Sequence, residues 1–207
     1  MIHQMFPTSN GINSVITIVQ KEHKVLRQHA KSVPPKEIKG GKIKKVLADM
    51  KTALDSQDDG IAIAAPQINA PLRIFLVSKK IHQIEEDERK TPSQETKVKE
   101  DSHGDSKKKK DLVFINPEII KLSKKKYWAP EGCLSVRWLY GKVFRADKAT
   151  VRAYNENGER FTRGASGLLA QIFQHEIDHL NGILFIDTAK DLEELNPEEM
   201  KKNSRAK

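Results

Sequence analysis

The chain has 207 residues, of which 37% are hydrophobic and 31% charged, and its formal net charge is +9. A chain of this length and composition can bury one substantial core, so we predict a single domain over residues 1–207. No apolar run reaches the roughly 18–20 residues that a membrane-spanning helix needs, and the first residues lack the basic start and apolar core of a secretory signal. These features predict a cytoplasmic protein without a membrane partner.

The basic surplus favours contact with anionic partners, such as nucleic acid or the surface of a ribosome. No zinc-finger spacing, phosphate-binding glycine loop or aromatic-basic RNA motif accompanies the surplus. We therefore predict no sequence-specific nucleic-acid partner, and we keep the ribosome surface as an open alternative.

The first predicted element is an amphipathic helix over residues 43–54, where five apolar residues recur at helical spacing. Strands are predicted next at 71–78 and at 112–120, the second interrupted by Pro117, and we expect them to lie close together. The segment between them, 82–111, contains almost no apolar residue. Because it could not offset the entropy cost of being ordered, it is predicted to be a disordered insertion.

A hairpin is predicted in the second half of the chain. Alternating residues at 149–154 lead into an Asn-Gly turn at Asn157, and a return strand follows. A helix over 164–180 comes next, and a charged tail at 188–207 is expected to hold at most a short helix up to Leu195. The order of elements indicates an α+β fold, with antiparallel sheets packed around the C-terminal-half helix.

That helix carries the segment "QHEIDH", a His-Glu-x-x-His pattern. Residues four apart lie one turn above each other on a helix, so His175 and His179 point the same way and can hold one ion. Glu176 is displaced by about 100° and can address a water on that ion instead. The histidines share a stripe with Leu168 and Ile172, where buried imidazoles are costly unless they are coordinated. The pattern therefore predicts a metal site.

A catalytic ion would need a third protein ligand, and the sequence offers two sources. The single cysteine, Cys133 in "PEGCLS", excludes an internal disulfide and leaves one thiol for packing, catalysis or metal. A glutamate-ligated zinc endopeptidase would instead take its ligand from the acidic tail. The candidates there are Glu193, Glu194, Glu198 and Glu199, of which Glu198 and Glu199 are the ones that such a peptidase would use.

Three segments in this order resemble the signature motifs of the peptide deformylase family: "GIAIAAPQ" at 60–67, "EGCLS" at 131–135 and "QHEIDH" at 174–179. The resemblance extends to "INPEI" at 115–119, "KVFRADKATVRA" at 142–153 and "GILFID" at 182–187. It covers most of the chain except the 82–111 insertion and the tail.

The resemblance implies hydrolytic removal of the formyl group from the N-terminal formylmethionine of new polypeptides, with release of formate. By this match Cys133, His175 and His179 hold one divalent metal ion per chain, and Glu176 exchanges protons with the attacking water. The Gln67 side-chain amide and the Leu134 backbone N–H would stabilise the oxyanion. The family favours Fe²⁺, although the ligand set also suits Zn²⁺, Ni²⁺ and Co²⁺.

The family binds its peptide as an added strand, with the methionine side chain in an apolar pocket. The matching positions here are Ile61, Ala62, Gly132, Leu168 and Ile172.

The chain departs from the family pattern beside these positions. Ala62 replaces a glycine, and Arg137 and Trp138 follow Val136 where a proline is common, so we expect a differently shaped loop. Ser166 and Gln171 are further departures. Two other functions stay open: a zinc endopeptidase, and a non-catalytic homologue that binds a ribosome or RNA through its basic surface.

Overall fold

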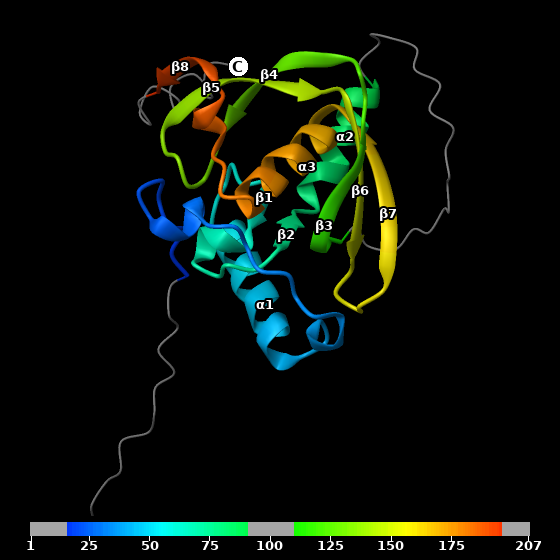
Figure 1. Cartoon of the computed structure of the whole chain (residues 1–207). Helices are drawn as coiled ribbons and strands as arrows, with labels where there is room; N and C mark the ends of the chain where they lie inside the picture. Colours follow the sequence, from blue (N-terminus) through cyan, green and yellow to red (C-terminus); the bar gives the residue numbers. More distant parts are fainter. Residues whose placement is uncertain (1–15, 91–109, 196–207) are drawn as a thin grey trace, which may run out of the picture.

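The computed structural model describes residues 16–90 and 110–195. Its elements form two antiparallel sheets and three α-helices (Figure 1). The helices are α1 (Gly41–Asp55), α2 (Lys80–Lys90) and α3 (Gly167–Leu180). Four short 3₁₀ helices connect other elements: η1 (Lys24–Arg27), η2 (Pro35–Glu37), η3 (Ala65–Ile68) and η4 (Phe185–Asp187).

The larger sheet has five strands in the order β1-β2-β3-β6-β7. Their bounds are β1 Ala62–Ala64, β2 Ile74–Val77, β3 Leu112–Leu122, β6 Lys148–Tyr154 and β7 Arg160–Ser166. The ladder between β3 and β6 is irregular between Ile115 and Glu118, where Asn116 has a positive φ of 51° and Pro117 follows. Because proline has no N–H to donate, the pairing changes register at this point.

The smaller sheet has three strands in the order β4-β5-β8: β4 Lys126–Gly132, β5 Leu139–Ala146 and β8 Lys190–Glu194. β4 is an edge strand of this sheet, and β1 is an edge strand of the larger one. The segment that leaves β4 contains Cys133, and the segment that follows β1 contains Gln67. The two open edges therefore bring two of the predicted site motifs to the same region of the molecule.

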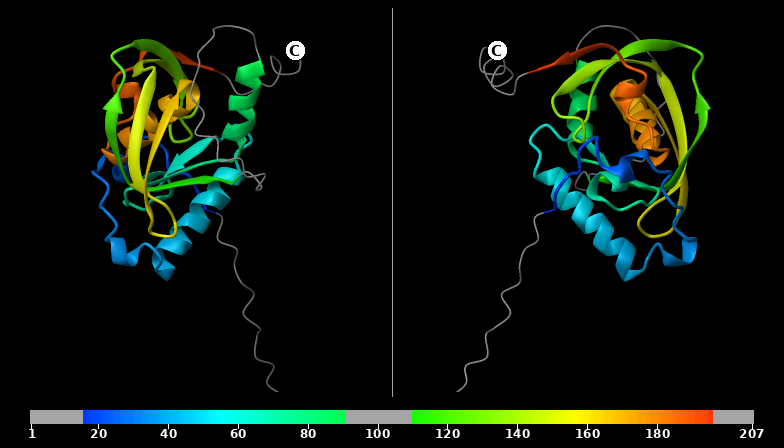
Figure 2. Two further views of the ribbon diagram at one scale, coloured as in Figure 1. Left: turned by 90° about the vertical axis from the view of Figure 1, so that its right-hand side faces the viewer. Right: turned by 60° about the vertical axis from the view of Figure 1, so that its left-hand side comes forward.

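The helix α3 is the central element of the fold, and the strands wrap around it (Figures 1 and 2). Its apolar residues pack on one face of the five-stranded sheet, where Phe173 meets Phe75 and Phe114. Phe75 and Phe114 stack with ring centroids 4.4 Å apart, and the Phe173 ring stands edge-on to Phe114 at 5.0 Å. The helix α1 covers the opposite face of the same sheet through Met50 and Leu54. Both faces of the sheet are thus buried around β1 and β2, where the two helices pack, and α3 also contacts β5 of the smaller sheet.

The structure has the α+β character expected from the sequence, with antiparallel sheets and a long helix near the C-terminal end. The helix expected over 43–54 is α1, and the strands expected at 71–78 and 112–120 correspond to β2 and β3, which pair. The expected hairpin is β6 and β7. The helix expected to begin at 164 begins at Gly167, because 164–166 complete the strand β7.

The prediction of disorder over 82–111 was wrong for its first part, where α2 continues to Lys90. Ile81 is fully buried in the core cluster and anchors the first turn of this helix. The following Glu, Lys and Arg residues have high helix propensity, and Gln83 Nε2 donates a hydrogen bond to Asp87 Oδ1 at 2.9 Å, one turn later. The rest of the predicted insertion, 91–109, lies outside the described residues.

The prediction of a charged tail with at most a short helix was also wrong for 190–194, which form the strand β8. β8 adds to the edge of β5, with Tyr140 opposite Glu193. Edge pairing uses backbone groups, so it can recruit a strand whose side chains are all exposed. Residues 196–207 lie outside the described part. Within the described residues, no helix is both long and apolar enough to span a membrane.

Replacing Phe114 with alanine should destabilise the fold by about 3–5 kcal/mol, because the change empties a fully buried site among three aromatic rings. Urea denaturation would measure this loss. Phe144→Ala is the matched control, since Phe144 is 51% exposed and should lose less than about 1 kcal/mol. Equal losses in the two variants would contradict this account of the core.

Candidate active site

Three potential metal ligands meet between the end of β4 and the helix α3. Among the described residues, Cys133, His175 and His179 each offer one ligand atom, and these atoms all lie within 4.8 Å of one another. The Cys133 Sγ is 3.2 Å from His179 Nε2. His175 and His179 lie one turn apart on α3, as the four-residue spacing predicts, and the His179 side chain is fully buried.

The chemistry of this group fits a divalent cation. Thiolate sulfur and imidazole nitrogen are ligands that zinc and related divalent ions accept, and three protein ligands leave a further position for water or substrate. Two buried polar atoms beside the group, Glu176 Oε2 and His179 Nδ1, have no hydrogen-bond partner within the described structure. Burial lowers the pKa of His179 well below its usual value, so the ring is neutral, which is the form that binds a metal.

A carboxylate fixes the orientation of the other histidine. Glu131 Oε2 lies 2.9 Å from His175 Nδ1, which leaves His175 Nε2 directed at the ligand group. Burial opposes a charge on His175, but its contacts with Cys133 and Glu131 outweigh burial and raise its pKa. A cation that binds this ring must therefore displace a proton.

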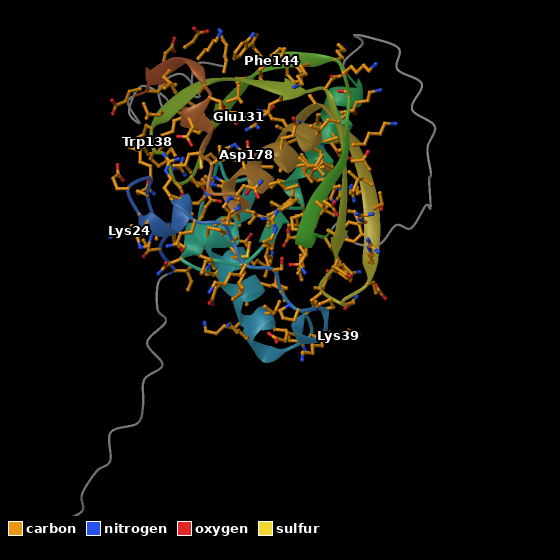
Figure 3. The ribbon with its side chains drawn as sticks, in the orientation of Figure 1. Lys24, Lys39, Glu131, Trp138, Phe144 and Asp178 are labelled. Atoms are coloured by element: carbon orange, nitrogen blue, oxygen red, sulfur yellow. The ribbon has the colours of Figure 1, made fainter. Side chains whose placement is uncertain are left out.

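Glu131 is itself held by an ion-pair network around Arg145, whose two acids, Glu131 and Asp178, are labelled in Figure 3. Arg145 donates to both oxygens of Glu131, at 2.7 and 3.1 Å, and its Nη1 donates to Asp178 Oδ2 at 2.6 Å. Burial alone would raise the pKa of Glu131, but the hydrogen bonds from His175 and Arg145 lower it to about 2. Glu131 therefore stays ionised and can polarise His175 at all ordinary pH values.

Glu176 lies next to His175 on α3 and is 4% exposed. Burial raises the pKa of its carboxyl group to about 7. A group whose pKa lies near neutrality can both accept and return a proton under physiological conditions. Glu176 therefore has the properties of a general acid-base residue.

The Gln67 side-chain amide is held with its nitrogen towards the ligand group. Its Oε1 accepts a hydrogen bond from the Ala64 N–H at 2.7 Å, which fixes the orientation of the amide. Its Nε2 donates to Ser135 Oγ at 3.1 Å and to Cys133 Sγ at 3.6 Å. The contact with Cys133 Sγ is longer than the contact with Ser135 Oγ. A substrate oxygen could therefore replace the sulfur as the acceptor of this N–H.

These groups border a cavity of about 350 Å³. Gln67, Cys133, Leu134, His175 and Glu176 line it, whereas His179 is buried behind them. Gly132 lies against the Tyr140 ring, which would be 2.6 Å from a Cβ at this position, so any larger residue would require the ring to shift. Every residue predicted to contact substrate lines the same cavity: Ile61, Ala62, Gly132, Leu168 and Ile172.

Comparison with known proteins identifies the family. The family model for polypeptide deformylase matches residues 15–195. The chain belongs to this family. It is 36% identical over 176 residues to the peptide deformylase of Syntrophomonas wolfei, covering 85% of this chain and 94% of the relative. It is 38% identical over 164 residues to that of Agrobacterium fabrum, covering 79% of this chain and 80% of the relative.

A solved structure shares the fold of the chain. The class I type b peptide deformylase from Acinetobacter baumannii, bound to Met-Ala-Ser, has a TM-score of 0.66 and 28% sequence identity, with 84% of this chain and 98% of that chain covered. Peptide deformylases are metal-dependent hydrolases that remove formyl groups from nascent peptides, and deformylation is the function of this chain.

The residues that support the ligands were missed in the sequence. Glu131, Arg145 and Asp178 were not singled out, although a signal was present for each. Arg145 occupies an inward position of β5, two residues after the buried Val143, where a charge needs a partner. Glu131 and Asp178 stand inside the motifs already noted, two residues before Cys133 and one before His179.

The acidic residues required by the alternative zinc endopeptidase lie away from the site, as far as the described residues show. Glu193 and Glu194 lie in β8, are exposed, and pair through their backbone with Tyr140 and Leu139. Glu198 and Glu199 lie outside the described residues. The family assignment makes deformylation, not endopeptidase activity, the function of the chain.

Replacing Glu131 with glutamine should weaken metal binding by about tenfold to a hundredfold, because His175 loses its ionised partner. Competition titration of Zn²⁺ against a chelator would measure the change. Glu118→Gln is the matched control, since Glu118 pairs with Arg152 on the surface, and circular dichroism would verify that both variants fold. Unchanged zinc affinity in folded Glu131→Gln would contradict the supporting role of Glu131.

Proposed function

We propose that Cys133, His175 and His179 hold the divalent ion with which this chain removes the formyl group from N-terminal formylmethionine. One observation carries this assignment: the three ligand atoms lie within 4.8 Å of one another, and Cys133, His175, the buried Glu176 and the oriented Gln67 amide border one cavity. A divalent ion in such a set supplies Lewis acidity and a water that ionises near neutral pH.

The remaining steps depend on the protein's own residues. Glu176 accepts the proton of the attacking water and later returns it to the departing amine, for which a pKa of about 7 is well placed. The formyl oxygen becomes negative as the water adds. The Gln67 Nε2 and the Leu134 backbone N–H stabilise that charge, because both residues line the cavity beside Cys133. Formate and a free methionine amine are the products.

The open edge of β1 supports binding of the peptide as an added strand. Ser78 N–H donates to the Ile61 carbonyl, so the alternation of an antiparallel ladder turns the Ala62 N–H and C=O away from β2, towards the open edge. Ala62 lines the cavity, as does Gly132 at the end of the other edge strand, β4. A peptide lying between them would bond through its backbone and so tolerate many sequences.

Leu168 and Ile172 supply apolar surface for the methionine side chain. Gln171 also lines this part of the cavity, but its Nε2 donates to the Pro130 carbonyl at 2.7 Å. The amide is thereby partly satisfied within the protein, which reduces its effect on an apolar side chain nearby.

We propose Fe²⁺ as the working ion, on the ground of the family resemblance, with Zn²⁺, Ni²⁺ and Co²⁺ compatible with the same ligands. Formate release by protein loaded with each ion under anaerobic conditions would compare them. We further propose that one catalytic domain acts in the cytoplasm on chains leaving the ribosome. The net charge of +9 supports contact with an anionic ribosome surface.

Replacing Glu176 with glutamine should reduce formate release from formyl-Met-Ala-Ser by a factor of about a hundred or more, because the amide cannot accept the water's proton. The variant should still bind one metal ion, since Glu176 is not a ligand in this proposal. Glu159→Gln, on an exposed turn, is the control. Formate release equal to that of the unaltered protein would refute the role of Glu176.

Replacing Gln67 with alanine should lower kcat by about a hundredfold with a smaller effect on KM, because the donated hydrogen bond strengthens only as the oxyanion forms. Steady-state kinetics on the same peptide would separate the two constants. Gln83→Ala on α2 should leave both unchanged. A rise in KM with kcat intact would show that Gln67 binds substrate without stabilising the reaction.

A further inference from the structure

An ion pair joins the two loops that border the cavity beyond the catalytic group. Arg137 Nη1 donates to Asp59 Oδ2 at 2.5 Å, and Arg137 Nη2 donates to Asp59 Oδ1 and to Gln57 Oε1, each at 3.0 Å. The Arg137 side chain is 19% exposed and that of Asp59 is 55% exposed. A two-pronged pair of this kind fixes the orientation of its partners as well as their separation.

The pair stands on the two segments between which the peptide is proposed to lie. Asp59 directly precedes Gly60 and Ile61, which lead into the edge strand β1, and Arg137 follows Cys133 and Val136 after the edge strand β4. Asp59 and Arg137 both line the cavity. Because the open edge runs from Ala62 back towards Asp59, a peptide bound in the proposed way would pass from the catalytic group towards this pair.

Each loop is also held by its own local hydrogen bonds, so neither loop depends on the ion pair alone for its conformation. The Gly60 N–H donates to the Gln57 carbonyl, and Lys80 Nζ binds the carbonyls of Gln57 and Asp58. On the other side, the Val136 N–H donates to the Cys133 carbonyl, and the Val136 side chain is buried. The ion pair fixes the distance between the two loops, which these local bonds do not.

We propose that Asp59 and Arg137 are positioning residues whose ion pair sets the width of the cleft that holds the peptide beyond its methionine. This inference rests on the proposed function and extends it to the residues that follow the methionine. Arg137 stands where the family commonly has proline, so the tie is a property of this chain. The ring of Trp138, a residue labelled in Figure 3, lies 4.8 Å from the Arg137 guanidinium and adds a further contact that holds Arg137 in place.

The Asp59–Arg137 ion pair acts on peptide binding, so its loss should change KM and leave kcat nearly unaltered. In Arg137→Gln we expect KM for formyl-Met-Ala-Ser to rise about fivefold, the upper range for a partly exposed ion pair, with kcat within about twofold. The rise should be smaller for formyl-Met-amide, which has no residue beyond the methionine. Arg152→Gln removes a surface pair with Glu118 outside the cavity and is the matched control, with both constants unchanged.

Three further measurements separate a tie from a merely structural role. Asp59→Asn should raise KM as much as Arg137→Gln does, and the double variant should be no worse than either single variant, since all three lack the same pair. Arg137→Lys should bind the peptide more tightly than Arg137→Gln does, because lysine keeps the positive charge but cannot form the two-pronged pair of the guanidinium. Raising the salt to 1 M should increase KM of the unaltered protein towards that of Arg137→Gln and leave the variant unaffected.

The inference is overturned if Arg137→Gln leaves KM unchanged for both substrates, or if it lowers kcat equally on both with a lower melting temperature. Additive effects of the two single variants would also overturn it. A different result would contradict the proposed function: the unaltered, metal-loaded protein would release no formate from either substrate.

Discussion

The burial of a charged and polar cluster beneath the strands is the constraint on which the rest of this structure depends. Two imidazoles, a thiol and the Glu176 carboxyl stand on or against one helix, in positions where isolated polar groups would cost several kcal/mol. The fold accommodates the two imidazoles by giving each a defined environment. His175 is held by Glu131, and His179 is kept neutral by burial.

The same constraint accounts for the ion pairs deeper in the structure. Glu131 remains ionised within the protein because His175 and Arg145 both hydrogen-bond to it, and Arg145 in turn binds Asp178 on α3. The network joins the strands β4 and β5 to the helix that carries the histidines. Removing one member would leave a buried charge unpaired, so the ligand geometry and the stability of this region are coupled.

The proposed binding of the peptide as an added strand gives the open edges of the two sheets a role. In that proposal the peptide pairs with backbone groups at the edges of β1 and β4, whose residues Ala62 and Gly132 line the cavity. Exposed edges are prone to unwanted pairing, which short strands limit, and β1 has only three residues. The Asp59–Arg137 pair holds the loops at the far end of the same cleft.

The sequence by itself placed the two histidines together and marked the elements with strong periodicity, whereas Cys133 came into the predicted ligand set through the family resemblance. Helical spacing places His175 and His179 on one face, and alternating or apolar runs mark β2, β3 and β6. Only the tertiary structure decided what the acids inside the motifs do, because the contacts of Glu131 with His175 and of Arg145 with Glu131 and Asp178 join residues distant in the chain. It also decided that 190–194 form a strand and that α2 extends past Ile81, since a free strand edge and a buried anchor are supplied by residues distant in the chain.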